Sequence, residues 1–143
     1  MSRFAVAELL AEEDALPVAV LSDLDWVQAV QSGFPVSAVD AVVRELGFSL
    51  AEIERLVMPR RTLAHRRAQG QPLTREESDR LARVARVALA AREAFGDPGN
   101  AHTWLRRPNR ALQGNLPIHL LDTDDGARLV EDVLGRLEHG LFS

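Results

Sequence analysis

The sequence contains no cysteine and no lysine among its 143 residues. The absence of cysteine excludes disulfide bonds and thiolate metal sites, and it suits a reducing compartment. No apolar run reaches the roughly 18 residues that a transmembrane helix needs, so we expect no membrane partner. Near the start of the chain, acids occupy the positions where a signal peptide would have its apolar core. We therefore expect a cytoplasmic protein.

Motifs of catalysis and of metal binding are also missing. The four histidines are scattered, and no two of them have the spacing of a metal site: His65, His102, His119 and His139. No nucleophile elbow and no phosphate-binding loop occurs, and residues 96–99 have the composition of a turn. We therefore expect a protein that is not an enzyme and that uses neither a metal nor a cofactor.

The charged residues fall into blocks of opposite sign. Residues 1–58 carry three arginines and ten acids, a net charge of −7, whereas residues 59–110 carry twelve arginines and five acids, a net charge of +7. Residues 111–143 carry two arginines and six acids, a net charge of −4. An arginine-rich block inside an acidic protein indicates one anion-binding region. Arginine suits phosphate and guanine recognition, although the exclusive use of arginine could equally reflect a biased genome.

Apolar residues recur at helical spacing through most of the chain and predict an all-α fold. Two capping boxes, Ser49 with Glu52 and Thr74 with Glu77, mark helix starts, and Ser22 and Thr123 are further expected caps. The predicted helices span residues 23–31, 38–46, 50–57, 60–69, 74–95, 101–106 and 110–113, with a last one from 124 to a stop at Gly140. The long helix at 74–95 is expected to join two helical regions.

The break at residues 96–100, with the sequence GDPGN, suggests the main internal boundary. We expect three parts: an N-terminal extension at 1–21, a helix-turn-helix and dimerisation region at 22–95, and a C-terminal region at 96–143. The extension could be an amphipathic helix that ends near Pro17, or a mobile arm.

Residues 59–70 read PRRTLAHRRAQG and concentrate the positive charge. Pro59 cannot continue the preceding helix but fits the first turn of the next one, so residues 58–59 are the expected turn between two short helices. A short arginine-rich helix behind a turn is typical of the DNA-reading helix of a helix-turn-helix. The alternative is that these charges only cover a solvent-exposed face of the helix and bind no partner. The predicted DNA-binding residues are Arg60, Arg61, Thr62, His65, Arg66 and Arg67.

These six residues do not share one side of the helix. On a helical wheel Leu63 points to the core, and Arg61 and His65 lie nearly opposite to it. Arg66 and Arg67 lie nearer the core edge, where a structural role fits better than a base contact.

Four stretches of the sequence match one known family. They read RRTLAHRRAQG (60–70), ESDRLARVARV (77–87), AFGD (94–97) and WLRRPNRALQGNLPIHLLDTDDGARLVEDVLGRLEHGLFS (104–143). In these residues the chain resembles the Xre/ParS/MbcA antitoxins of RES–Xre toxin–antitoxin modules. The resemblance covers about residues 30–143 and leaves residues 1–21 outside it.

The resemblance implies an Xre-like helix-turn-helix region that forms a homodimer and binds the operator DNA of its own operon. It also implies a C-terminal antitoxin region that binds a RES-domain toxin. Such toxins consume NAD⁺, and the end of the antitoxin reaches into their active-site cleft. The resemblance implies that toxin binding involves the residues at the end of the chain that match the family's pattern: Arg136, Glu138, His139, Gly140, Leu141, Phe142 and Ser143. Without the resemblance, the same residues would be read as a chain end packed on the core.

The sequence therefore predicts an antitoxin that occludes the NAD⁺ site of a RES toxin and represses its own operon. One alternative is a stand-alone Xre-like repressor without a toxin partner. Another is a structural adaptor that does not bind DNA. Within the family, the arginines of residues 60–67 could also face the toxin instead of DNA.

Overall fold

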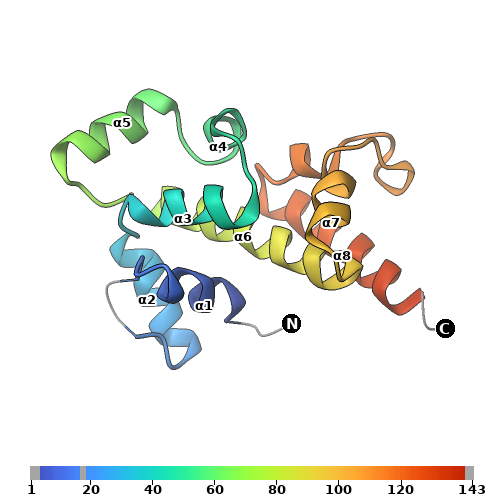
Figure 1. The fold of residues 1–143 in the computed structure, drawn as a ribbon, viewed down its shortest axis with the longest axis horizontal. Helices are drawn as coiled ribbons and strands as arrows, with labels where there is room; N and C mark the ends of the chain where they lie inside the picture. Colours follow the sequence, from blue (N-terminus) through green and yellow to red (C-terminus); the bar gives the residue numbers. More distant parts are fainter. Residues whose placement is uncertain (1–3, 17–18, 141–143) are drawn as a thin grey trace. The chain divides into compact units, whose positions relative to one another are not determined.

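The computed structural model describes residues 4–16 and 19–140 of the chain (Figure 1). Within these ranges the elements are eight α-helices and two short 3-10 helices, and no β-strand is present, so the all-α prediction is confirmed. None of these helices is both long enough and apolar enough to cross a membrane. The chain divides into two compact units, one of residues up to 82 and one of residues from 83, and helix α6 (Arg75–Phe95) passes from the first to the second.

The first unit contains five complete helices and the beginning of α6. The helices are α1 (Ala5–Glu12), α2 (Asp23–Ser32), α3 (Ser37–Leu46), α4 (Leu50–Leu56) and α5 (Arg60–Gln69). Ser22 caps α2 by accepting a hydrogen bond from the Asp25 amide. The expected capping boxes at the starts of α4 and α6 are both present, with reciprocal side-chain to backbone hydrogen bonds. These four-residue signals fix helix starts because they satisfy amide groups that have no partner inside the helix.

The N-terminal stretch contains a helix, as one of the two sequence interpretations has it. Helix α1 contacts α3 and buries Val6, Ala7 and Leu10. Arg44 on α3 forms an ion pair with Glu13, and the hydrogen bond in this pair raises the pKa of Arg44. Pro17, the expected end of this helix, lies outside the described residues.

The core of the first unit is organised around the segment between α2 and α3. The Phe34 side chain is fully buried, its amide donates to Ser78 Oγ at 2.9 Å, and its carbonyl accepts from the Leu73 amide at 2.8 Å. Gly33 has a φ of +90°, and a Cβ atom at this position would lie 2.1 Å from the Leu73 carbonyl oxygen. Only glycine permits this approach, which ties the start of α6 to the α2–α3 connection.

The second unit contains the remainder of α6, followed by α7 (Pro98–Leu105), η1 (Arg110–Leu112), η2 (Pro117–Leu120) and α8 (Asp124–Gly140). Helix α7 begins three residues before the expected start, so the boundary placed at residue 101 was wrong. The Asp97 side chain accepts from the amides of Gly99 and Asn100, and Pro98 occupies the first turn. The GDPGN stretch therefore interrupts helical structure only up to Asp97. The next helix begins at Pro98, because proline is compatible with the first turn of a helix.

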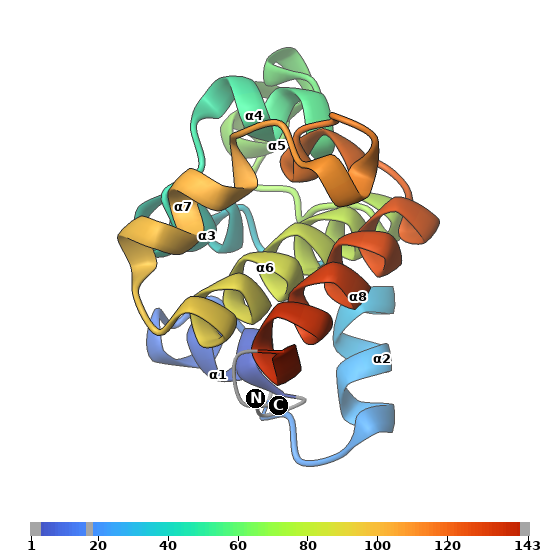
Figure 2. The same ribbon diagram turned by 90° about the vertical axis from the view of Figure 1, so that its right-hand side faces the viewer.

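Two arginines of α6 hold the second unit together. Arg83, only 9% exposed, donates to the carbonyl oxygens of Leu121 at 3.1 Å and Asp122 at 3.2 Å. Arg86 binds both carboxylate oxygens of Glu131, at 3.1 and 3.0 Å, so that α8 runs beside this part of α6 (Figure 2). A Cβ atom on Gly126 would lie 1.9 Å from the Leu120 carbonyl oxygen, which requires glycine at the start of α8.

Candidate functional site

The connection between α4 and α5 is a short, well-anchored turn. Helix α4 ends at Leu56 and α5 begins at Arg60, which confirms the turn predicted around residues 58–59. The Val57 carbonyl accepts a hydrogen bond of 2.9 Å from Arg80 Nη1, and the Met58 side chain is buried. On α5 the one buried side chain is Leu63. The remainder of this helix is therefore available for contacts outside the protein.

The outward face of α5 carries four of the six predicted DNA-binding residues. Arg60, Arg61 and His65 are exposed, and Thr62 is half-buried. Arg60 lies 3.7 Å from the Glu54 carboxylate, and both side chains in this pair are about half exposed. Within the described ranges, the side chains of Arg61 and His65 form no hydrogen bond or ion pair. Among the charged and titratable members of the set, these two are therefore available for a contact outside the protein.

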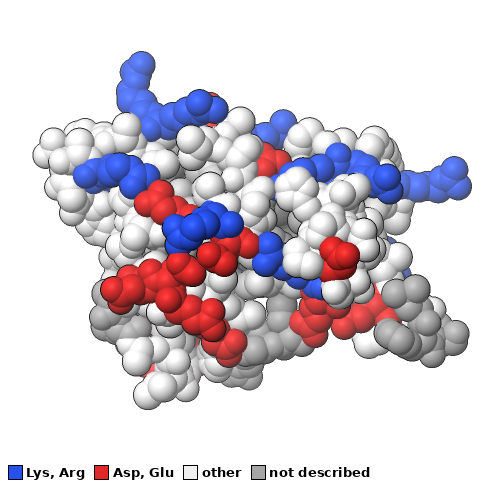
Figure 3. All heavy atoms as spheres, viewed as in Figure 1, with Lys and Arg blue, Asp and Glu red and all other residues white. Residues whose placement is uncertain are grey.

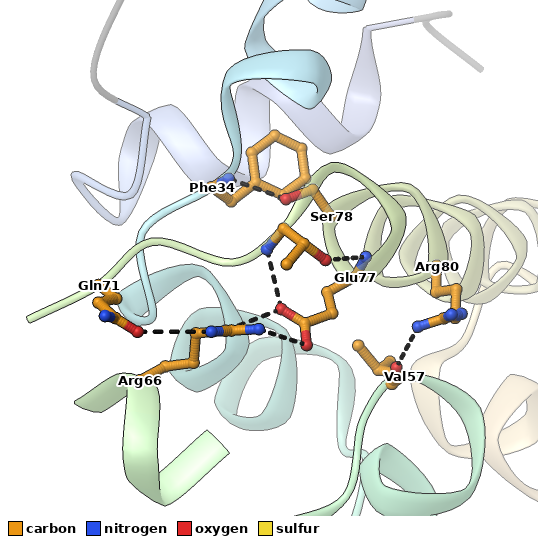
Figure 4. A network of polar contacts seen from close by, with 8 residues as sticks. Phe34, Val57, Arg66, Gln71, Glu77, Ser78 and Arg80 are labelled. Carbon is orange, nitrogen blue, oxygen red and sulfur yellow. Dashed lines mark hydrogen bonds and ion pairs between the residues drawn. The ribbon is translucent and has the colours of Figure 1, made fainter. Parts of the chain in front are cut away.

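Arg66 lies on the other side of α5 and is bound to a buried carboxylate (Figure 4). Its Nε and Nη2 atoms donate to the two oxygens of Glu77 at 3.1 and 3.3 Å, and its Nη1 atom donates to Gln71 at 3.4 Å. Glu77 Oε1 also accepts from the Thr74 amide at 2.8 Å. One carboxylate thus caps the start of α6 and holds α5 at the same time.

The pKa of the Glu77 carboxyl is affected by its contacts with both Arg66 and Thr74. Burial raises the pKa of the Glu77 carboxyl, but the hydrogen bonds from Arg66 and Thr74 outweigh burial, and the pKa lies below its ordinary value. The Glu77 carboxylate is therefore charged at neutral pH, although only 7% of this residue is exposed.

Arg67 forms a second, more exposed bridge from α5 to α3. Its two Nη atoms donate to the two oxygens of Asp40, each at 3.0 Å, and this hydrogen bonding raises the pKa of Arg67. The expected core-edge position of Arg66 and Arg67 is thus matched by two ion pairs that orient α5. In Figure 3, arginine atoms lie over α5 while acidic atoms gather over the α1–α3 side of this unit.

The predicted toxin-binding residues lie at the end of α8. Arg136, His139 and Gly140 are exposed, and Glu138 is half-buried. The buried side of α8 consists instead of Gly126, Ala127, Val130, Val133 and Leu134. The remaining members of the predicted set, Leu141, Phe142 and Ser143, lie outside the described residues. The last turn of α8 therefore offers a guanidinium, a carboxylate and an imidazole near the chain end.

An apolar surface on α2 and the residue before its cap, Leu21, was not predicted from the sequence. Leu21, Leu24 and Val27 are 85%, 64% and 45% exposed, and α2 buries only Ala29. Beside them lies a hollow of about 340 Å³. The hollow is lined by Trp26, Val27, Val30, Gln31, Arg75, Glu76 and Asp79. The spacing of three residues between these side chains places them on one side of a helix and could have indicated this surface. An apolar stripe in a sequence does not show, however, whether other parts of the chain bury it.

Residues 106–116 form a tightly hydrogen-bonded loop, in which the helical turn predicted at 110–113 is present as η1. The Asn109 amide donates to the Asn115 carbonyl at 3.0 Å, and the Asn109 carbonyl accepts from the Gly114 amide at 2.8 Å. Asn109 Oδ1 accepts from the Ala111 amide, and the Asn115 side chain donates to the Leu112 carbonyl, each at 2.9 Å. This loop, residues 106–116, displays Arg107 and Arg110 at the surface.

Comparisons with known proteins agree with this division of the chain. A family model described as the antitoxin Xre-like helix-turn-helix domain matches residues 25–86. A second, described as the antitoxin Xre/MbcA/ParS C-terminal toxin-binding domain, matches residues 90–140. The first match contains most of α2 and all of α3 to α5, and the second contains the 106–116 loop and α8.

Three similar proteins carry antitoxin names. A protein of Yersinia enterocolitica named Antitoxin Xre is 42% identical over 119 residues, which cover 82% of this chain and 80% of that protein. An Antitoxin Xre of Pseudomonas putida is 39% identical over 64% of this chain and 58% of that protein. A Prs ADP-ribosylating antitoxin of a Sphingobium species is 26% identical over 85% of this chain and 83% of that protein.

Proposed function

The chain belongs to the Xre family of antitoxins, and on that premise we propose that it neutralises a RES-domain toxin and represses its own operon. In this proposal the two activities occupy different units. The α4–α5 pair binds operator DNA, and the end of α8 with residues 141–143 blocks the toxin. The protein itself catalyses no reaction and works in the cytoplasm.

The observation that carries the DNA-binding half is the free outer face of α5. Arg61 and His65 are exposed on a helix whose orientation is held by Glu77 and Asp40 through Arg66 and Arg67. Such a helix can enter the major groove without first breaking an internal ion pair of Arg61 or His65, whereas Arg60 would exchange its pair with Glu54 for a DNA contact. Arg60, Arg61, Thr62 and His65 are the proposed contacts, whereas Arg66 and Arg67 orient the helix.

A salt-titrated mobility-shift assay on the promoter fragment tests this half. We expect Arg61→Ala to weaken operator binding by roughly 1–3 kcal/mol if the side chain pairs with guanine, and to flatten the salt dependence if it pairs with a phosphate. Arg128→Ala is a matched control, because Arg128 is exposed on α8 of the other unit. Unchanged affinity and salt dependence for Arg61→Ala would remove this residue from the interface.

The toxin-binding half rests on the exposed last turn of α8. A guanidinium such as that of Arg136, or a carboxylate, can occupy the space that the phosphates or ribose of NAD⁺ need in the toxin cleft. The toxin-binding set is Arg136, Glu138, His139, Gly140, Leu141, Phe142 and Ser143. Inhibition would then follow from exclusion of the substrate, without a chemical step on the antitoxin.

Co-expression with the product of the neighbouring gene tests the partner. We expect a RES-domain protein to co-purify, the mass of the complex to give the stoichiometry, and NAD⁺ consumption to be suppressed in the complex. A toxin that transfers ADP-ribose to a protein is a second candidate, favoured by the name of the Sphingobium relative. Transfer of radiolabel from NAD⁺ to a protein target, rather than release of free ADP-ribose, would identify that reaction.

We further propose that the first unit forms a homodimer through α2. The exposed Leu21 and Leu24 protrude beside an apolar hollow whose rim carries Arg75 together with Glu76 and Asp79. Protruding apolar groups, a hollow and charges of both signs on one patch allow two copies to pair about a two-fold axis. Sedimentation of Leu24→Glu, with Leu50→Glu as a control at a leucine that is also more than half exposed, is expected to show monomers for the first variant only.

A further inference from the structure

The 106–116 loop combines an ordered backbone with unengaged positive charge. Residues 98–121 contain three arginines and two histidines but no aspartate or glutamate. Arg107 and Arg110 are exposed, and within the described ranges their side chains make no hydrogen bond or ion pair. Elsewhere in the same unit, Arg86 and Arg128 are paired with acids and Arg83 with carbonyl groups.

The loop does not need these two arginines for its own structure. Its shape is set by the hydrogen bonds of Asn109 and Asn115, by buried Leu112, and by Gln113 and Gly114 at φ values of 57° and 84°. A loop that is fixed before binding loses little conformational freedom when a partner attaches. Ordered surface loops with charges that serve no internal purpose are typical binding elements.

From these observations we propose that Arg107 and Arg110 belong to the toxin-contacting surface and pair with carboxylates of the toxin. The inference rests on the proposed function, since it presumes a toxin partner. It extends the interface beyond the end of α8 to a loop that precedes that helix. A protein partner is favoured over DNA because the whole loop lies inside the 90–140 match to the toxin-binding domain, outside the helix-turn-helix match.

The two elements would have separable tasks. Exposed charges at the edge of an interface accelerate association and make it sensitive to salt, because they act at a distance before contact. The end of α8 would instead block the active site once the complex has formed. The loop therefore governs how fast and how tightly the toxin is captured, and the chain end governs whether it is inhibited.

The test measures the association rate of a full-length double variant that carries both Arg107→Gln and Arg110→Gln, and compares it with that of wild type. The rate is measured by stopped-flow binding to the RES protein of the neighbouring gene. We expect association about tenfold slower at low salt and a flatter salt dependence. Inhibition of NAD⁺ consumption at saturating antitoxin should stay complete. The double variant with Arg44→Gln and Arg55→Gln is the charge-matched control, because it removes two exposed arginines of the other unit that belong to neither proposed interface, and it should associate at the wild-type rate.

Three results would overturn the inference. The first is a wild-type association rate and salt dependence for the loop variant. The second is an equal slowing by the control pair, which would indicate a general charge effect. The third is weakened operator binding by the loop variant with unchanged toxin association, which would make the loop a nucleic-acid contact.

Two further measurements separate a loss of binding from a loss of folding and from a loss of arginine geometry alone. Thermal unfolding of the loop variant should match wild type, and Arg107→Lys with Arg110→Lys should restore most of the association rate because the charge is kept. If wild-type chain itself fails to bind or inhibit the toxin, the proposed function fails, and that result is distinct from a loop variant that binds normally.

Discussion

Arginine is used differently on α5 of the first unit and on α6 and the loop of the second. On α5, Arg66 and Arg67 are held by Glu77 and Asp40, while Arg61 on the outer face has no partner among residues 4–16 and 19–140. In the second unit, Arg83 and Arg86 of α6 and Arg128 of α8 have partners, whereas within the described ranges the side chains of Arg107 and Arg110 in the 106–116 loop have none. Arg83 and Arg86 of α6 bind η2 and α8.

The difference shows how to separate structural from functional arginines in a chain that has no lysine. Arginines bound to carboxylates or carbonyl groups fix one helix against another, so their removal should change stability first. Arginines without internal partners contribute little to folding, so their removal should change binding first. In the first unit one helix, α5, holds both kinds, which explains why charge density alone could not rank them.

The largest effect on stability is expected from Arg83→Leu. This change leaves the carbonyl groups of Leu121 and Asp122 without their side-chain donor, and a buried unsatisfied group costs about 1–3 kcal/mol. Denaturant unfolding should show the loss, whereas Arg107→Leu in the same unit should stay within about 0.5 kcal/mol of wild type. Equal losses for both variants would break the proposed distinction between paired and unpaired arginines.

Glu77→Gln should come next, with an effect that depends on pH. The folded pKa of Glu77 lies below the ordinary value, so its charged form stabilises the protein above the unfolded pKa, near 4.3. That stabilisation is lost as the pH falls through the folded pKa. We expect a loss of roughly 1–3 kcal/mol at neutral pH that shrinks in acid, measured by urea unfolding between pH 7 and pH 3. A difference from wild type that is independent of pH would argue against the ion pair with Arg66.

The smallest effect on stability is expected from Asp40→Asn. Both partners in the Arg67–Asp40 pair are about half exposed, so water screens the pair and its loss should cost less than about 1 kcal/mol. Raising the salt concentration should reduce the difference from wild type. A loss as large as that of Glu77→Gln would show that α5 depends on α3 as much as on α6.

Much of the fold could be predicted because its signals are local. The capping boxes at Ser49 and Thr74, the caps at Ser22 and Thr123, and the proline after α4 all act within a few residues, and the starts of α2, α4, α5, α6 and α8 follow from them. The start of α7 was misplaced because a glycine and a proline were read together as a break, although Asp97 caps a helix there.

The partners of the site residues could not be predicted, because they are set by tertiary packing. Arg66 and Glu77 are 11 residues apart, and Arg67 and Asp40 are 27 apart. A helical wheel places Arg66 and Arg67 near the core edge but does not identify which acids meet them. The exposed face of α2 and the free arginines of the 106–116 loop likewise depend on what the remainder of the chain leaves uncovered.

The central claim is that regulation and inhibition lie at different places in the chain, on α5 and at the end of α8. The most direct measurement is NAD⁺ consumption by the toxin in the presence of chain lacking residues 141–143, alongside operator binding by the same chain. The account predicts that operator affinity and unfolding are unchanged while the toxin remains active. Complete neutralisation by the truncated chain would contradict it.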